Sequence, residues 1–217
     1  MSYRMADRLG TPQIKQILVV ITKRVTQARD QLNDMDSACG DGDFGTSMWI
    51  SFSNARKQLD ELPISDIGTM ILAAGQAILS SAGGAAGPIF GSFFIEAGKV
   101  VKGKDELNIA DLARMFDASL EKIKLQGGAK VGDKTVVDAL EPAVNALRED
   151  VARNTGLAQS LTNAASAARI GCESTKGIVA RHGKARYLGE QSLGYVDPGA
   201  HVMMIIFEAF AKSQETD

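Results

Sequence analysis

The sequence TPQIKQILVVITKRVTQARDQL, residues 11–32, leads directly into NDMDSACGDGDFGTSM, residues 33–48, and this pairing of an apolar-striped segment with a glycine-rich loop recurs along the chain. Thr11 and Pro12 suit the N-cap and first position of a helix. The run 17–21 also fits a buried strand. Apolar residues at helical spacing favour the helix: Ile14, Ile17, Leu18, Ile21 and Val25.

Seven further segments show the 3.6-residue period of helices, and proline or glycine separates them. We expect Ser65, Asn108, Asp133 and Asp197 to act as N-caps for four of these segments. The seven helices are expected near these residues: 46–59, 66–80, from 88, from 108, from 133, 156–180 and from 197. No strand is predicted with them. The sequence therefore predicts an all-α fold, a bundle or ring of eight antiparallel helices with functional loops gathered at one end.

The bulk composition excludes several classes of protein. The chain has 217 residues, a net charge of −2 and no basic run, which argues against nucleic acid and anionic membranes as partners. Its two cysteines, Cys39 and Cys172, belong to no metal or disulfide pattern. No signal peptide or membrane-spanning stretch is visible, so we expect a cytoplasmic protein.

The loop after the first helix carries three carboxylates within eight residues: Asp36, Asp41 and Asp43. Carboxylates this close repel one another unless a cation lies between them, and Mg²⁺ prefers oxygen ligands and often carries phosphates. The loop matches the dinucleotide pattern GxGxxG, but two aspartates inside the pattern would repel a pyrophosphate. The glutamate that ends a calcium-binding EF-hand loop is missing. The sequence predicts a magnesium site here, and a solvated turn is the alternative.

Four more loops are candidates for binding an anion or nucleotide. Residues 80–88 lead into a helix N-terminus, which favours phosphate, although they also fit a tight turn. Residues 127–135 resemble a Walker A loop, but Asp133 breaks its spacing and no strand precedes it. Residues 181–190 offer three cations that suit a transferring phosphoryl group or, alternatively, a solvated basic turn. Residues 197–200 indicate a helix start.

Taken together, these loops resemble one family closely, the L subunit or C-terminal nucleotide-binding domain of dihydroxyacetone kinases. The matching segments are DSACGDGDFGTSM at 36–48, SSAGGAAGPIFG at 80–91, GDKTVVDALEP at 132–142 and GKARYLGEQSLGYVDPGA at 183–200. They keep the order and approximate spacing of the family and cover nearly the whole chain. The resemblance implies a single domain, residues 1–217, folded as a barrel of eight antiparallel helices.

The resemblance also implies a site. Two Mg²⁺ ions would be held by Asp36, Asp41 and Asp43, and would hold the phosphates of ADP or ATP. Lys184 would contact the transferring phosphoryl group. The nucleotide contacts of the family fall on these residues of the chain: Phe44, Gly45, Thr46, Ser47, Ala85, Ala86, Gly127, Val136, Lys184, Asp197, Pro198 and Gly199.

The family further implies partners. A K subunit holds dihydroxyacetone or a related ketose, and in one branch an M subunit of the phosphotransferase system recharges a resident ADP. Phe44, Lys184, Gln191 and Tyr195 stand where the family usually has other residues. The main prediction is therefore a phosphotransferase subunit, and two alternatives stay open. One is an ATP-dependent kinase subunit for another polyol or ketose, and the other is a non-catalytic nucleotide-binding regulator.

Overall fold

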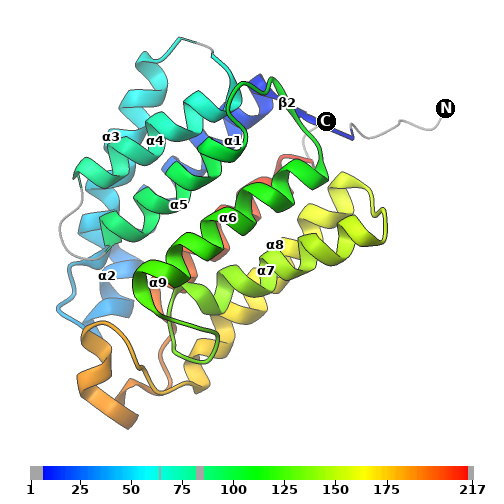
Figure 1. The fold of residues 1–217 in the computed structure, drawn as a ribbon. Helices are drawn as coiled ribbons and strands as arrows, with labels where there is room; N and C mark the ends of the chain where they lie inside the picture. The colour runs from blue at the N-terminus through cyan, green and yellow to red at the C-terminus, as the bar shows by residue number, and fades with distance from the viewer. Residues whose placement is uncertain (1–6, 64, 82–85, 215–217) are drawn as a thin grey trace.

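The structure is a computed structural model that describes residues 7–63, 65–81 and 86–214. It is almost entirely helical, with one two-stranded antiparallel sheet in which Leu9 pairs with Leu107. The elements, of which the α-helices and β2 are labelled in Figure 1, are β1 (Leu9–Gly10), α1 (Thr11–Gln27), α2 (Arg29–Ser37), α3 (Phe44–Glu61), α4 (Ile67–Ser81), α5 (Ala86–Val100), β2 (Glu106–Leu107), α6 (Ile109–Gly127), α7 (Val136–Ala152), α8 (Leu157–Ser174), the 3₁₀ turns η1 (Thr175–Gly177) and η2 (Lys184–Ser192), and α9 (Pro198–Lys212).

Helices that follow one another in the chain also pack side by side. From α3 to α9 each helix contacts the next, and α1 contacts both α3 and α9. The short helix α2 lies against α3. We call residues 181–195 the arm; Figure 1 shows it in orange at the end of the molecule where α2 leads into α3, with β2 at the opposite end.

The interior is built from the apolar stripes of these helices, and its centre is aromatic. Phe93 of α5 stacks on Phe116 of α6 with ring centroids 5.8 Å apart, and Phe116 meets Phe207 and Phe210 of α9 at 4.9 and 5.2 Å. All four rings are fully or almost fully buried. Burial of side chains this large is the main contribution to the stability of the helix packing.

The sequence predicted the helical class correctly, but the structure differs from its expectations and alternatives in four respects. The expected first helix divides at Ala28, whose backbone is not helical, so nine α-helices rather than eight occur in the described residues. The run 17–21 is helical, so the strand alternative was wrong. The expected helix 156–180 ends at Ser174, and the strands β1 and β2 were not predicted.

Two of the four expected N-caps are confirmed and two are wrong. The side chains of Asn108 and Asp197 accept backbone N–H groups at the starts of α6 and α9. Thr135, rather than Asp133, caps α7. The backbone N–H of Thr69 is bound by Asp66 at 3.0 Å and not by Ser65. At α1 the N-cap is Gly10, so Thr11 and Pro12 lie one position further in than expected.

Among the helices of the described residues, none is both long enough and apolar enough to cross a lipid bilayer.

Candidate functional site

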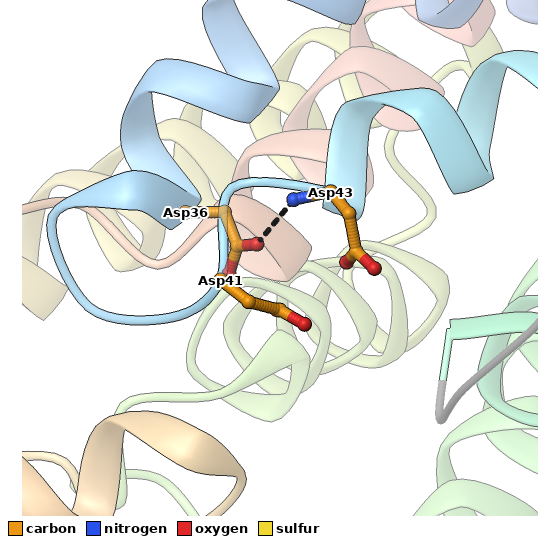
Figure 2. A group of neighbouring side chains, drawn as sticks. All are labelled: Asp36, Asp41 and Asp43. Carbon is orange, nitrogen blue, oxygen red and sulfur yellow. Dashed lines mark hydrogen bonds between the residues drawn. The ribbon is translucent and has the colours of Figure 1, made fainter.

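The acidic loop joins the end of α2 to the start of α3. Asp36 lies in the last turn of α2, and Asp43 is the N-cap residue of α3. The carboxylate of Asp36 accepts hydrogen bonds from the backbone N–H groups of Asp43 at 3.1 Å and Phe44 at 3.2 Å, the first of which is drawn in Figure 2. The loop is therefore closed onto the N-terminus of α3, where free N–H groups and the helix dipole favour negative charge.

The three aspartates converge as the sequence predicted. One carboxylate oxygen from each of Asp36, Asp41 and Asp43 lies within 4.8 Å of the others. Figure 2 shows the carboxylates of Asp41 and Asp43 pointing toward the same side of the loop. Asp41 and Asp43 are exposed and Asp36 is half-buried. In the part of the chain that the structure describes, this is the one such group of potential metal ligands, and its all-oxygen donors suit Mg²⁺.

A close crossing of α2 and α3 fixes the spacing of the aspartates. A Cβ atom at Gly45 would overlap the carbonyl oxygen of Arg29 and lie 2.8 Å from the backbone nitrogen of Asn33. Asn33 also binds Thr46 twice: its Oδ1 accepts the backbone N–H at 3.0 Å, and its Nδ2 donates to the hydroxyl at 3.1 Å. Sequence reasoning missed Asn33, because its partner lies on the next helix.

Lys184 reaches the aspartates from the arm. Its ammonium group donates to the carboxylate of Asp41, and both side chains are largely exposed. The hydrogen bond from Lys184 lowers the pKa of Asp41, and the same bond raises the pKa of Lys184. The positive charge of Lys184 therefore lies next to Asp41, at the edge of the set of three aspartates.

The start of α9 forms the next part of the site. Asp197 caps the helix by accepting the N–H of Ala200 at 2.7 Å, and Pro198 follows at the first helical position. Gly199 lies against Val136, the first residue of α7, since a Cβ at Gly199 would be 2.6 Å from a Val136 methyl group. Burial raises the pKa of Asp197 to about 7.

The thiol of Cys39, in the acidic loop, is buried. Burial raises the pKa of Cys39; the charge of Lys134 lowers it, and the charges of Asp197 and Asp36 raise it further. The helices on either side are also in contact, since α2 packs against α9. The acidic loop, Lys134 and the start of α9 therefore lie within electrostatic range of one another.

The other predicted contacts are spread more widely. Phe44 begins α3, and its ring meets Phe90 of α5 edge-on at 6.5 Å, while Ala86 is buried at the start of α5. Ser47 is half-buried in the first turn of α3. Gly127 is exposed at the end of α6. Ala85 lies outside the described residues.

Sequence reasoning also missed the residues that support the arm. Lys134 is 4% exposed, and its ammonium group donates to the backbone carbonyls of Thr175, at 2.6 Å, and Tyr195. Burial lowers the pKa of Lys134. The signal was the lysine of the rejected Walker-like loop, but nothing in the local pattern indicates that this side chain is buried.

Comparison with known proteins was made for the whole chain. Residues 38–212 match the family model of the DAK2 domain. The chain is 36% identical over 182 residues to the "PEP-dependent dihydroxyacetone kinase, ADP-binding subunit DhaL" of Escherichia coli K12, covering 84% of this chain and 87% of that protein. It is 36% identical over 195 residues to the corresponding subunit of kinase 2 of Listeria innocua, covering 87% of this chain and 90% of the relative.

A solved structure is similar over almost the whole chain. It is the dihydroxyacetone kinase of C. freundii in complex with AMP-PNP and Mg²⁺, with a TM-score of 0.73 and 27% sequence identity. The alignment covers 98% of this chain but 36% of that kinase, so the present chain spans about a third of that kinase's length. From the match of the family model and the identity to full-length subunits, the chain belongs to the DAK2-domain family.

Proposed function

We propose that the chain is the nucleotide-binding L subunit of a dihydroxyacetone kinase. In this proposal it is a single domain, residues 1–217, whose helices form a barrel of eight antiparallel helices with the nucleotide at one end. Support comes from the packing order, since α1 and α3 to α9 contact one another in sequence and α9 returns to α1. The relatives named ADP-binding subunits match this chain over most of their length.

One observation carries the proposal: three aspartate carboxylates converge within 4.8 Å beside the N-terminus of α3, and a lysine from the arm binds one of them. Carboxylates gathered in this way are expected to hold a hard divalent cation. The residues present fit one or two Mg²⁺ ions, because all donors are oxygen and two of the three side chains are exposed to solvent. Asp36, Asp41 and Asp43 would be ligands rather than bases.

The surrounding residues fit the phosphates of ADP or ATP. At the start of α3 the N–H groups of Phe44 and Thr46 are already bound by Asp36 and Asn33. The donors proposed to meet an anion are therefore the N–H of Gly45 and the hydroxyls of Thr46 and Ser47. Ala86 at the start of α5, Gly127, and Val136 with the 197–199 segment are proposed to contact the rest of the nucleotide, together with Ala85, which lies outside the described residues. The small side chains among them leave room for a ligand to approach the backbone.

In phosphoryl transfer the protein contributes positioning and electrostatic stabilisation more than covalent chemistry. Bound Mg²⁺ would neutralise charge on the phosphates. The carboxylates of the acidic loop determine the position of the metal charge, and the N–H of Gly45 with the hydroxyls of Thr46 and Ser47 would orient the phosphate chain. Lys184 adds a positive charge that stabilises the transferring group. Because a lysine ammonium is a flexible point charge, it supplies charge without the rigid two-point contact of an arginine.

The acceptor is proposed to come from a separate K-type subunit that holds dihydroxyacetone or a related ketose. An M-type phosphotransferase subunit would recharge the bound nucleotide. Apolar side chains exposed near the arm suit a transient protein contact: Val131, Tyr187, Leu188, Leu193 and Tyr195.

The nucleotide content of the purified chain tests the proposal and separates it from its alternatives. The protein is denatured with acid, and the released nucleotide is identified by chromatography. Retained ADP supports a resident coenzyme recharged by a phosphotransferase relay. An empty protein that binds ATP reversibly with Mg²⁺ supports an ATP-dependent kinase subunit. Failure to bind any nucleotide would contradict the kinase proposal and also the alternative of a nucleotide-binding regulator.

A second step tests catalysis. The chain is first loaded with a nucleotide that carries a labelled phosphoryl group. It is then mixed with a K-type subunit and dihydroxyacetone, and the labelled sugar phosphate is measured. Nucleotide binding without transfer to the triose would favour the non-catalytic regulator.

A further inference from the structure

The arm needs external support to present Lys184 to the aspartates. It contains the 3₁₀ turn η2, which is interrupted at Gly189. Two hydrogen bonds within the arm span only three positions each: the Ser192 hydroxyl donates to the carbonyl of Gly189 at 2.6 Å, and the N–H of Leu193 donates to the carbonyl of Glu190 at 3.0 Å. Two more join the arm to the chain just before it, from Ala180 N–H to the Ser192 hydroxyl at 2.9 Å and from Gly194 N–H to the carbonyl of Lys176 at 2.8 Å. Short 3₁₀ segments are weakly stable by themselves. The position of Lys184 must therefore be fixed by contacts with the rest of the protein.

Lys134 supplies one such contact at each end of the stretch between α8 and α9, which contains the arm. Its backbone adopts the left-handed conformation, with φ of 61°, and its side chain enters the interior. The ammonium group binds the carbonyl of Thr175 just after α8 and the carbonyl of Tyr195 at the far end of the arm. One charged group therefore joins the two points at which the chain leaves and rejoins the helix bundle.

The same lysine reaches the start of α9 through Thr175. The hydroxyl of Thr175 accepts the backbone N–H of Asp197 at 2.9 Å. Burying an ammonium group is costly unless its donors are used. A lysine head has three donors, and these are suited to binding several carbonyls that converge from different segments.

Asp133 holds the beginning of the arm. Its backbone carbonyl accepts the N–H of Arg181 at 3.1 Å. Its carboxylate lies 3.3 Å from Nε2 of His182 and 3.7 Å from the guanidinium of Arg181. The carboxylate also accepts the N–H of Lys130 at 3.0 Å, so it is fixed by its own loop. These contacts are made two and three residues before Lys184.

We infer that Asp133 and Lys134 are positioning residues that hold the arm so that Lys184 meets the aspartate group. The inference rests on the proposed function, because it gives these residues a role in binding Mg-ADP through Lys184. If they only stabilised the fold, their removal would weaken nucleotide binding independently of Lys184. If they act through Lys184, replacing Asp133 or Lys134 should weaken nucleotide binding no further once Lys184 itself has been replaced.

A double-mutant cycle separates these outcomes. The affinity for Mg-ADP is measured by calorimetry for the native chain, Lys134→Met, Lys184→Met and the double variant. We expect each single variant to lose about 10-fold in affinity and the double variant to lose about 10-fold as well. A loss of about 100-fold in the double variant, or no loss in Lys134→Met, would overturn the inference.

A measurement without ligand examines the arm directly. Hydrogen–deuterium exchange of residues 181–195 is expected to be about 10-fold faster in Lys134→Met than in the native chain, with little change in α4 and α5. The control is Lys124→Met, which removes a lysine whose ammonium group binds Glu141 of α7 at 3.1 Å rather than a residue of the arm. If hydrogen–deuterium exchange in the arm is the same in Lys134→Met as in the native chain, Lys134 does not hold the arm in place.

A milder variant covers the case in which Lys134→Met does not fold. Asp133→Asn keeps an acceptor for Lys130 but loses the charge that faces Arg181 and His182. We expect faster exchange in the arm and a loss of about three-fold in Mg-ADP affinity that disappears when Lys184 is also replaced. A native chain that binds no nucleotide would refute the proposed function, while the exchange measurement would still decide whether Asp133 and Lys134 anchor the arm.

Discussion

The ammonium group of Lys184 binds the carboxylate of Asp41, although 143 positions separate the two residues in the sequence. Asp41 belongs to the loop between α2 and α3, and Lys184 to the arm between α8 and α9. The contact places a lysine of one loop beside the three aspartates of another, where the proposed phosphoryl transfer would use a positive charge.

Replacing Lys184 should therefore affect a metal ion and a nucleotide in opposite directions. In Lys184→Met, the group of three carboxylates loses a neighbouring positive charge, so we expect divalent cations alone to bind about three-fold more tightly. Mg-ADP should bind about 10-fold more weakly, because an attraction to phosphate is lost. Binding of Mn²⁺ by electron paramagnetic resonance and of Mg-ADP by calorimetry measures the two effects.

The control for this variant is Lys176→Met, since Lys176 pairs with Glu173 on the surface after α8. It should leave both affinities within about two-fold of the native values. Equal changes in the affinities for metal and nucleotide in Lys184→Met would show that Lys184 has no specific part in phosphate binding.

Gly45→Ala should damage both stability and the metal site. The added methyl group would overlap the carbonyl oxygen of Arg29, so α2 and α3 must move apart. We expect a loss of about 2–3 kcal/mol in the free energy of unfolding. Gly177→Ala is the matched control, because a Cβ there meets no neighbour. Urea unfolding checks both; an unchanged stability in Gly45→Ala would mean that the crossing is looser than described.

Asp197→Asn should alter how stability depends on pH. Burial raises the pKa of Asp197 to about 7. The negative charge of Asp138 raises this pKa further, and the positive charge of Lys134 opposes the increase. The folded protein therefore holds a proton that the unfolded chain releases above its ordinary pKa near 4. The stability from this proton is fully present below about pH 4 and is lost as the pH rises through about 7.

Asparagine keeps the N-cap of α9 but does not titrate. Between pH 5.5 and 8.5, without Mg²⁺ or nucleotide, Asp197→Asn should gain about 1–2 kcal/mol relative to the native chain. Urea unfolding at both pH values measures the difference. A difference that stays constant across this range would show that the carboxyl of Asp197 is already ionised at pH 5.5.

Glu208 lies outside the proposed nucleotide site, and we expect its side chain to contribute to the free energy of unfolding. It is buried on α9 between Arg24 of α1, at 2.5 Å, and Arg169 of α8. Glu208→Gln leaves two guanidinium groups without their carboxylate, and we expect a loss of about 2 kcal/mol in the free energy of unfolding. The loss is below that for a fully buried pair, because both arginines retain solvent contact.

The matched change Glu173→Gln removes a carboxylate whose side chain is 54% exposed. It should cost less than about 0.5 kcal/mol, as is usual for surface pairs. Thermal unfolding compares the two variants, and equal losses would indicate that the contacts of Glu208 contribute no more than those of a surface pair.

The helical class was predictable because apolar residues at helical spacing are a local signal. The division of the first helix at Ala28 was not predictable, because no proline or glycine marks it. The strands β1 and β2 were equally hidden, since each has two residues and they pair across nearly 100 positions. Both features depend on tertiary contacts rather than on local preference.

The aspartate group was predictable because all three residues lie in one short loop. Lys184 was proposed from the family resemblance, and the structure adds its contact with Asp41. The roles of Asn33 and Lys134 could not be read from the sequence. Asn33 acts across a helix crossing, and Lys134 is buried by segments 41 and 61 positions away.

The central claim is that the three aspartates hold Mg²⁺, which in turn holds the nucleotide. The most direct test is equilibrium dialysis of labelled ADP with the native chain, Asp41→Ala and Asp34→Ala, each with Mg²⁺ and with EDTA. Asp34 is an exposed residue of α2 close to the same loop and serves as the control. Circular dichroism verifies that each variant keeps its helices.

We predict that the native chain and Asp34→Ala bind ADP with Mg²⁺, and that EDTA or Asp41→Ala reduces the affinity by about 100-fold or more without loss of helix. Native binding that persists in EDTA, or normal Mg-ADP binding by Asp41→Ala, would contradict the assignment of these aspartates as metal ligands.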